Sequence, residues 1–201
     1  ASVGLLGFGK MASREMTVAS DLDFILIYEV EGGAEDSNGE KPLATSQYFA
    51  RLTQRLVAAV TAPTSEGVLY QADMRLRPSG NAGPLATSLS AFQRYQEESA
   101  WTWEHLALTR ARVVDADEGF AAKIEGTVAA ILSRPSAAGK TIDDVVSMRA
   151  LMAKERPPRH PFDLKLVPGG LIDLEFIAQS AQLLARERIG RPQAPTAIVL
   201  A

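Results

Sequence analysis

Cysteine is absent from this chain of 201 residues, and histidine occurs only twice. The lack of cysteine excludes disulfide bonds and thiolate metal sites, which suits a cytoplasmic protein. His105 and His160 are too far apart in the chain to predict a metal-ligand cluster, so we expect a structural or surface role for both. No apolar run reaches the roughly 18 residues of a membrane span and no signal segment leads the chain, so we expect no membrane association.

Neither sign of charge dominates, since 21 Lys and Arg residues face 24 Asp and Glu residues for a net charge of −3. This weakly acidic balance gives no overall attraction to nucleic acid, and we expect no nucleic-acid partner. The hydrophobic share of 46% is that of a globular protein, and the length allows one large or two small domains. Because the chain starts at Ala1 without Met and stops at Ala201 just after an apolar run, we expect a piece excised from a longer polypeptide.

Three aspartates are the most informative polar residues. Asp21 and Asp23 come just before the apolar residues 24–28, and side chains alternate along a strand, so both would project from the same face of a buried strand. A second strand-like run, residues 68–73, ends in Asp73 and would lie beside the first. Three carboxylates suit Mg²⁺, and two Mg²⁺ ions can clamp the attacking and leaving oxygens when a nucleotidyl group is transferred to a hydroxyl.

Further residues near these aspartates predict phosphate binding. Gly9 allows a close backbone approach to phosphate, its N–H and that of Lys10 can donate, and the lysine adds positive charge. Arg75 and Arg77 follow Asp73 at alternate positions, so on a strand reaching residue 77 all three would share one face. Two interpretations stay open: the arginines bind triphosphate oxygens as bidentate forks, or they form a salt-bridge ladder with Asp73 that needs no metal.

Two other phosphate motifs nearly match at the start of the chain. Residues 4–10 have the P-loop spacing, but Met11 stands where a Ser or Thr hydroxyl should ligate Mg²⁺. Residues 7–12 fit a loose dinucleotide fingerprint, which needs a preceding strand and a ribose-binding acid about twenty residues further on. Only three residues precede Gly4, and the acids that follow form an aspartate pair, so we disfavour both motifs.

Hydrophobic periodicity predicts a chain in two parts. We expect an α/β (α+β) domain with a small mixed sheet over residues 1–115, followed by a helical domain over residues 116–201 that is cut short. The predicted elements of the first part are a glycine turn opening a short helix (4–19), a strand (21–30), a helix from a Ser46 cap through Val60, a strand ending near Arg77 and an exposed loop (78–84). From Ser88 onwards they are helices near 89–98, 100–113 and 117–133, a helix from Thr141, a strand (162–167) and a final helix from Gly170 to about Arg188.

Five motifs occur in order along nearly the whole chain: Gly-Phe-Gly-Lys-Met (7–11), Ser-Asp-Leu-Asp (20–23), Asp-Met-Arg-Leu-Arg-Pro-Ser-Gly (73–80), Trp-Thr-Trp-Glu-His (101–105) and Gly-Gly-Leu-Ile-Asp-Leu-Glu-Phe (169–176). Together they resemble the glutamine synthetase adenylyltransferase family of polymerase-beta-type nucleotidyltransferases. Polypeptides of that family carry two similar halves, one attaching AMP to glutamine synthetase and one removing it. The resemblance is to the C-terminal, attaching half, because the removing half tends to have Phe where Ser79 stands. A departure is Ala12-Ser13, where small glycines are common in the family.

The resemblance implies a cytoplasmic enzyme of nitrogen regulation that transfers AMP from ATP to a tyrosine hydroxyl of glutamine synthetase, with the PII signal protein as regulator. Alternatives are phosphorolytic removal of AMP, or a non-catalytic module that binds nucleotide or PII. The turn at 169–170 would face the catalytic cleft and give Asp173 or Glu175 a supporting role, although carboxylates at a helix N-terminus also simply complement its dipole. The implied site comprises Asp21, Asp23 and Asp73 as catalytic and metal-binding residues, and Gly9, Lys10, Ser20, Arg75 and Arg77 as nucleotide-binding residues.

Overall fold

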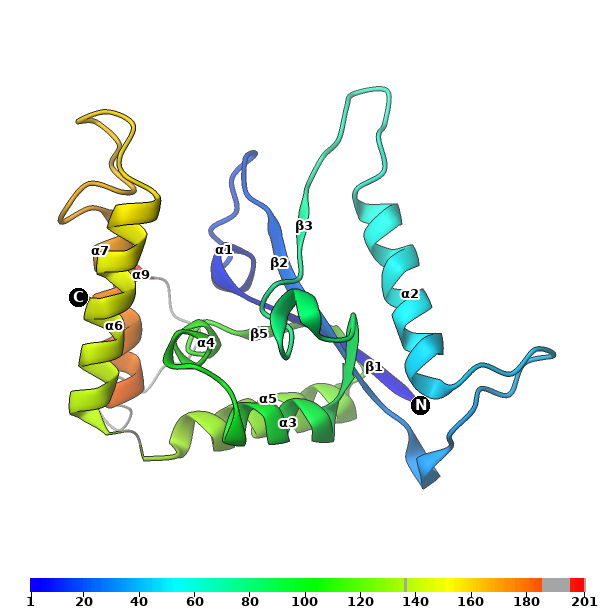
Figure 1. Cartoon of the computed structure of the whole chain (residues 1–201). Helices are drawn as coiled ribbons and strands as arrows, with labels where there is room; N and C mark the ends of the chain where they lie inside the picture. The colour runs from blue at the N-terminus through cyan, green and yellow to red at the C-terminus, as the bar shows by residue number, and fades with distance from the viewer. Residues whose placement is uncertain (136, 186–195, 201) are drawn as a thin grey trace. The chain divides into compact units, whose positions relative to one another are not determined.

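The computed structural model describes residues 1–135, 137–185 and 196–200 (Figure 1). Its mixed α/β architecture with a small mixed sheet confirms the coarse fold prediction. The elements are β1 (Ser2–Gly7), α1 (Gly9–Ser13), β2 (Leu22–Glu29), the 3₁₀ turn η1 (Glu31–Gly33), α2 (Thr45–Val60), β3 (Ala72–Asp73), the 3₁₀ turn η2 (Gly80–Ala82), β4 (Ala86–Ser88), α3 (Leu89–Glu98), α4 (Thr102–Leu108), β5 (Arg112–Ala116), α5 (Glu118–Ser133), α6 (Ala138–Glu155), α7 (Leu171–Leu184) and α9 (Thr196–Val199).

The chain divides into two compact units that interleave along the sequence. The first comprises residues 1–100 and 111–131, and the second comprises residues 101–110 together with the chain from 132 onwards. Helix α4 therefore groups with the second unit and α5 with the first. The domain boundary between residues 115 and 116 stays a prediction. No helix of the described ranges is both long and apolar enough to cross a lipid bilayer.

Strand β2 is the centre of the sheet in the first unit. It pairs antiparallel with β1, which in turn pairs antiparallel with β5, while β3 and β4 pair parallel with successive stretches on the other edge of β2. Residues 24–27 are all buried, so both faces of this strand are covered, as an uninterrupted apolar run requires. The strand predicted at 21–30 is thus confirmed.

Helices α2 and α5 supply much of the packing against this sheet. Phe49 on α2 stacks on Tyr28 of β2 with ring centroids 4.0 Å apart. On α5 an apolar stripe of Phe120, Ile124, Val128 and Ile131 is buried, and the helix fits closely because Gly4 has no side chain. A Cβ on Gly4 would lie 2.6 Å from Ile124 Cδ1.

Several boundaries in the first unit correct the sequence predictions. Residues 2–7 form a strand where a glycine turn was expected, and β5 (residues 112–116) begins within the last two residues of the predicted helix 100–113. Strand β3 stops at Asp73 and residues 75–79 turn, so Asp73, Arg75 and Arg77 do not share a strand face. The N-cap of α2 is Ala44 rather than Ser46.

Strand β1 also supplies the strand before a helix that the dinucleotide motif at residues 7–12 was expected to lack. However, β1 and β2 are antiparallel, whereas a dinucleotide-binding unit needs parallel strands joined by a crossover helix. The antiparallel topology therefore argues against dinucleotide binding at residues 7–12, whereas the sequence argument concerned the short segment before Gly4 and the aspartate pair.

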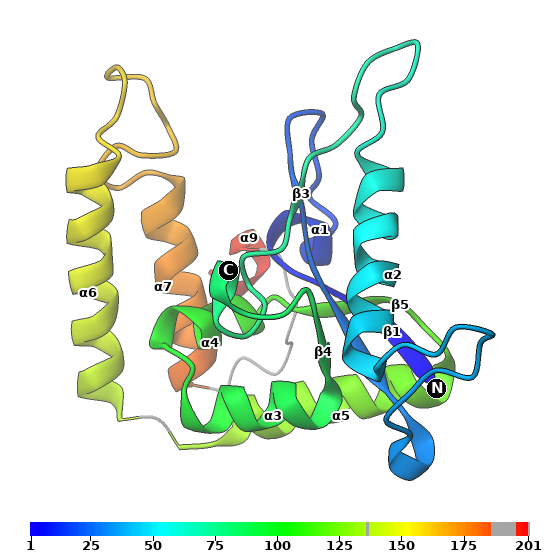
Figure 2. The ribbon, with the colours of Figure 1, turned by 45° about the vertical axis from the view of Figure 1, so that its right-hand side comes forward.

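The second unit is helical, and α6 and α7 lie side by side in it (Figure 2). The strand predicted at 162–167 is wrong, because these residues form successive turns in which Val167 N donates to Asp163 O at 3.1 Å. Helix α6 begins at Ala138, three residues before the predicted start at Thr141, and Thr141 is a buried residue within the helix. Helix α7 begins after Gly170 as predicted and ends at Leu184, and the predicted extension to Arg188 falls outside the described residues.

Candidate functional site

Two of the predicted aspartates lie side by side on neighbouring strands. The parallel pairing of β2 with β3 matches Leu22 to Ala72 and Asp23 to Asp73, and Leu22 N donates to Gln71 O at 2.8 Å just before it. Because paired residues on adjacent strands present their side chains together, this register brings Asp23 and Asp73 to the same place on the sheet edge. Asp21, just before β2, is exposed.

The turn between β1 and α1 lies directly against Asp23. Phe8 is buried, and its N–H donates to the Asp23 carbonyl oxygen at 2.8 Å. Gly9 has φ +51°, and a Cβ built on it would lie 3.1 Å from Asp23 Oδ2. Glycine is needed here for two reasons, since a side chain would be strained in this backbone conformation and would also press on the carboxylate. Lys10 follows, exposed on α1.

Arg112 holds this short helix from the neighbouring strand. It pairs with Gly7 across β1 and β5, and its Nε and Nη2 atoms donate to the carbonyl oxygens of Ala12 and Met11 at 2.8 and 3.2 Å. These carbonyls belong to the last turn of α1, whose acceptors have no partner within the helix. A guanidinium at a helix C-terminus also complements the helix dipole. Sequence reasoning missed Arg112, because no local motif links it to α1.

Asp73 is held by Arg75. The Nε atom of Arg75 donates to both carboxylate oxygens, at 3.0 and 2.8 Å, and Nη2 donates to Oδ2. The backbone N–H of Arg75 adds a bond of 2.9 Å to Oδ1. The side-chain hydrogen bonds from Arg75 are the largest cause of a lowered pKa for Asp73. The ion pair of the predicted salt-bridge alternative therefore exists, although a turn rather than a strand face produces it.

Arg77 is turned inward. It is buried, its Nη1 atom donates to Met74 O at 2.9 Å and its Nε atom to Gly83 O at 3.4 Å. Gly83 has no room for a side chain, because a Cβ would lie 1.9 Å from Pro78 O. Arg77 thus fastens the loop 78–84 to the end of β3, and its predicted contact with phosphate stays a prediction.

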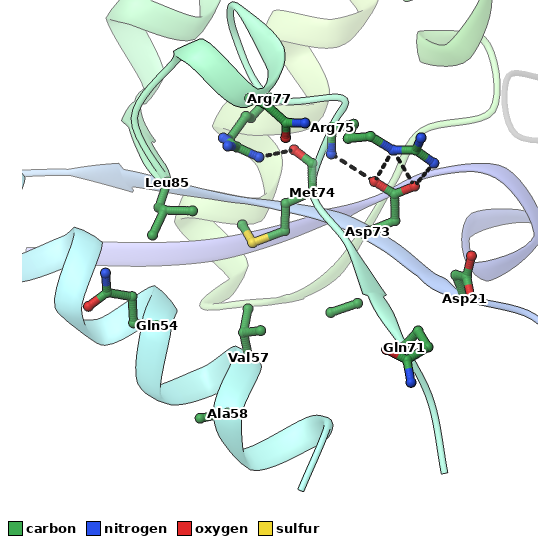
Figure 3. Close-up of a pocket in the computed structure, with 12 residues that line it drawn as sticks. Asp21, Gln54, Val57, Ala58, Gln71, Asp73, Met74, Arg75, Arg77 and Leu85 are labelled. Atoms are coloured by element: carbon green, nitrogen blue, oxygen red, sulfur yellow. Dashed lines mark hydrogen bonds and ion pairs between the residues drawn. The ribbon is translucent and has the colours of Figure 1, made fainter. Parts of the chain in front are cut away.

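A pocket of about 570 Å³ opens beside these residues (Figure 3). Four of the predicted residues line it, namely Asp21, Asp73, Arg75 and Arg77. Its apolar wall includes Val57, Met74 and Leu85, and the volume lies within the range of small-molecule sites. The sequence analysis did not single out Gln54 and Asn81 of the lining. Gln54, Val57 and Ala58 share one face of α2, which is the helical spacing that could have indicated a lining surface.

Ser20, Asp173 and Glu175 contact other protein side chains or backbone groups. Ser20 Oγ accepts a hydrogen bond from Thr17 N at 3.0 Å within the loop before β2. In the second unit, Asp173 forms an ion pair with Arg149, and its Oδ2 atom accepts a hydrogen bond from Gly169 N at 2.6 Å. Glu175 Oε1 lies 3.5 Å from Arg110 Nη1. The hydrogen bond from Arg149 is the main cause of a lowered pKa for Asp173. These contacts give both acids a structural function, so their supporting role in catalysis stays a prediction.

Among the described residues, no group of three or more acidic or histidine side chains is arranged to hold a metal ion. The chemistry of the donors nevertheless fits Mg²⁺, since Asp21, Asp23 and Asp73 offer only carboxylate oxygens. In addition, the guanidinium of Arg75 is hydrogen bonded to both oxygens of the Asp73 carboxylate, which would compete with a cation there.

Known proteins resemble the chain along most of its length. The sequence profile of the family described as glutamate-ammonia ligase adenylyltransferase matches residues 1–127. The bifunctional glutamine synthetase adenylyltransferase/adenylyl-removing enzyme of Mesorhizobium japonicum is 54% identical over 198 residues, which cover 98% of this chain and 20% of that protein. The protein of the same name from Brucella suis is 59% identical over 91% of this chain, and that from Rhizobium meliloti is 52% identical over 92% of it. The match covers 19% of each of these two proteins. The chain therefore spans about a fifth of the length of the curated relatives it matches.

Proposed function

Because this chain belongs to the glutamate-ammonia ligase adenylyltransferase family, we propose that it transfers AMP from ATP to a tyrosine hydroxyl of glutamine synthetase and releases pyrophosphate. One observation carries the proposal at the level of residues: Asp23 and Asp73 are paired in register, Gly9 lies against Asp23, and Asp73 lines a pocket of suitable size. The cytoplasmic location, regulation by PII and a helical domain completed by the rest of a longer polypeptide are parts of the same proposal.

The proposal assigns roles to the residues around the paired aspartates. Asp21, Asp23 and Asp73 would hold Mg²⁺, which supplies charge neutralisation at the phosphates and polarises the attacking hydroxyl. The backbone of Gly9 and the ammonium of Lys10 would bind the leaving phosphates. The apolar wall of the pocket offers a surface for the adenine ring.

The chemistry also requires a proton acceptor. The tyrosine oxygen forms a bond to the α-phosphorus of ATP, the bond from that phosphorus to the bridging oxygen of pyrophosphate breaks, and the hydroxyl proton passes to a base. A tyrosine hydroxyl has a pKa of about 10, so it needs such help at neutral pH. Asp73 is the candidate base. Its hydrogen bonds with Arg75 lower its pKa and weaken it as a base, so it accepts a proton more readily when Arg75 is bound elsewhere.

Position 79 distinguishes the attaching half from the removing half in the family resemblance. Ser79 adopts φ +61°, a left-handed conformation that bulky residues rarely take. A phenylalanine, the residue typical of the removing half at this position, would be strained in this loop. The loop is thus compatible with Ser79, on which the resemblance to the attaching half rests, while phosphorolytic removal is the second candidate because the relatives' name includes an adenylyl-removing enzyme.

Transfer of label from radioactive ATP to purified glutamine synthetase, with and without Mg²⁺, tests the proposal. GTP, CTP and UTP run in parallel test the choice of nucleotide. We expect label on the protein only with Mg²⁺ and ATP, together with pyrophosphate release. Release of ADP from adenylylated glutamine synthetase on addition of phosphate would instead assign the removing reaction. A binding module without chemistry would show Mg²⁺-independent affinity for its partner and no pyrophosphate.

A further inference from the structure

The guanidinium of Arg75 binds the Asp73 carboxylate, to which a metal ion would bind at the proposed catalytic site. The guanidinium binds both oxygens of Asp73, and Figure 3 shows the carboxylate turned toward it. Arg75 therefore neutralises one of the three carboxylates proposed to hold Mg²⁺, the one that is paired in register with Asp23.

The two partners of this ion pair differ in their freedom to move. The Arg75 side chain is 63% exposed, whereas the Asp73 side chain is 17% exposed and its residue belongs to β3. Arg75 can leave by rotating into solvent without disturbing the core. Arg77 cannot do the same, because it is buried and bonded to two backbone carbonyls. Of the two pocket arginines, Arg75 is thus the one able to exchange partners.

A triphosphate offers Arg75 an alternative partner of the same kind. Guanidinium groups bind carboxylate and phosphate in the same bidentate manner, and Arg75 lines the pocket beside Asp73. Removal of Arg75 from Asp73 would free both carboxylate oxygens beside Asp23, its partner in register. Nucleotide binding and cation binding would then favour each other.

We propose that Arg75 is a positioning residue that couples the two ligands: without nucleotide it occupies Asp73 and opposes divalent cations, and the phosphates of ATP draw it away and release Asp73 for the cation. This inference rests on the proposed function, because it takes ATP as the substrate of the pocket. A simple phosphate-binding role for Arg75 would instead predict that replacing Arg75 leaves the cation affinity of the nucleotide-free chain unchanged.

Direct measurement of Mn²⁺ binding by electron paramagnetic resonance, on the nucleotide-free chain, separates these roles. Arg75→Gln should bind Mn²⁺ roughly tenfold or more tightly than the unmodified chain, since charge-assisted hydrogen bonds to Asp73 are lost. Arg75→Lys keeps the charge but lacks the planar fork, and should give an intermediate affinity. Arg94→Gln, which replaces an exposed arginine on α3, is the matched control and should leave Mn²⁺ affinity unchanged.

A double-mutant comparison shows whether the effect passes through Asp73. Adding Arg75→Gln to an Asp73→Asn chain should not tighten Mn²⁺ binding, because the carboxylate that Arg75 protects is already gone. Thermal unfolding of each variant verifies that it is folded. Unchanged or weaker Mn²⁺ binding by folded Arg75→Gln would overturn the inference, as would an equal gain in the Asp73→Asn background.

The outcomes also distinguish this inference from the proposed function. Tighter Mn²⁺ binding by Arg75→Gln without AMP transfer by the unmodified chain supports the role of Arg75 and rejects the proposed reaction. AMP transfer with no change in Mn²⁺ affinity rejects the role of Arg75 alone. No Mn²⁺ binding by either chain, with or without ATP, rejects both.

Discussion

Which side chains meet at the proposed site depends more on the register of the strands than on which residues are neighbours in the sequence. Asp23 and Asp73 are separated by α2 and a long loop, yet parallel pairing of β2 and β3 brings them together. The sequence indicated both carboxylates because each adjoins a strand-like run. It could not decide whether Asp73 faces a metal or an arginine, because that depends on the turn that follows β3.

Replacement of Asp23 by Asn tests the central carboxylate. The amide keeps the size of the side chain but lacks its charge, so AMP transfer should fall by roughly a hundredfold or more while the fold is retained. The measurement is the initial rate of label transfer to glutamine synthetase, with circular dichroism as the check on folding. Asp115→Asn, an exposed aspartate on β5, is the control and should retain activity. Full activity in folded Asp23→Asn would contradict a metal-binding role.

At the scale of elements, long periodic segments were predicted well and short paired strands were not. Helices α3 and α5 and strand β2 follow the predicted ranges closely, because their buried stripes or runs are read directly from the sequence. Strands β1 and β5 were missed. Glycines interrupt the hydrophobic pattern of β1, and β5 is short, so pairing with neighbouring strands rather than local preference fixes both.

Arg112→Met tests the connection between β5 and α1. Loss of two hydrogen bonds to carbonyl oxygens at the end of α1 should lower the free energy of unfolding by about 1–2 kcal/mol. Urea unfolding of the whole chain measures the change. Arg112→Lys should recover part of the loss, and Arg94→Met should stay within about 0.5 kcal/mol of the unmodified chain. A loss no larger than that of Arg94→Met would show that these bonds do not stabilise the turn carrying Gly9.

At the scale of the whole molecule, contacts distant in sequence organise each unit. In the second unit the ion pair of Arg149 with Asp173 joins α6 to the start of α7, and Arg110, following α4, reaches Glu175. Gly170 makes the turn before α7 possible, because a Cβ there would lie 2.6 Å from Leu164 O. The motif at 169–176 drew attention to these residues for a different reason, namely its resemblance to a catalytic family.

Stability at acid pH tests the Arg149–Asp173 pair. Hydrogen bonding by Arg149 lowers the pKa of Asp173, so the ionised form is stabilised in the folded chain. Its contribution is therefore fully present above the ordinary aspartate pKa of about 3.9 and is lost as the pH falls through the lowered value. Asp173→Asn should destabilise the chain at pH 7 and much less near pH 3, as measured by urea unfolding at each pH.

The partner variant provides the control for this pH effect. Arg149→Met removes the same pair, so the difference between it and the unmodified chain should shrink over the same acid range. A destabilisation by Asp173→Asn that is equal at pH 7 and pH 3 would show that the ionised carboxylate does not contribute through this pair.

The sequence by itself determined the family, the mixed α/β class and the strand that carries Asp23, because motifs and uninterrupted apolar runs are local properties. Only the tertiary structure decided that Asp23 and Asp73 are neighbours, that Arg75 holds Asp73 and that Arg112 holds the glycine turn. Each of these contacts depends on strand register and on the direction of a turn. Those are set by the balance of packing over the whole unit, which no single stretch of sequence contains.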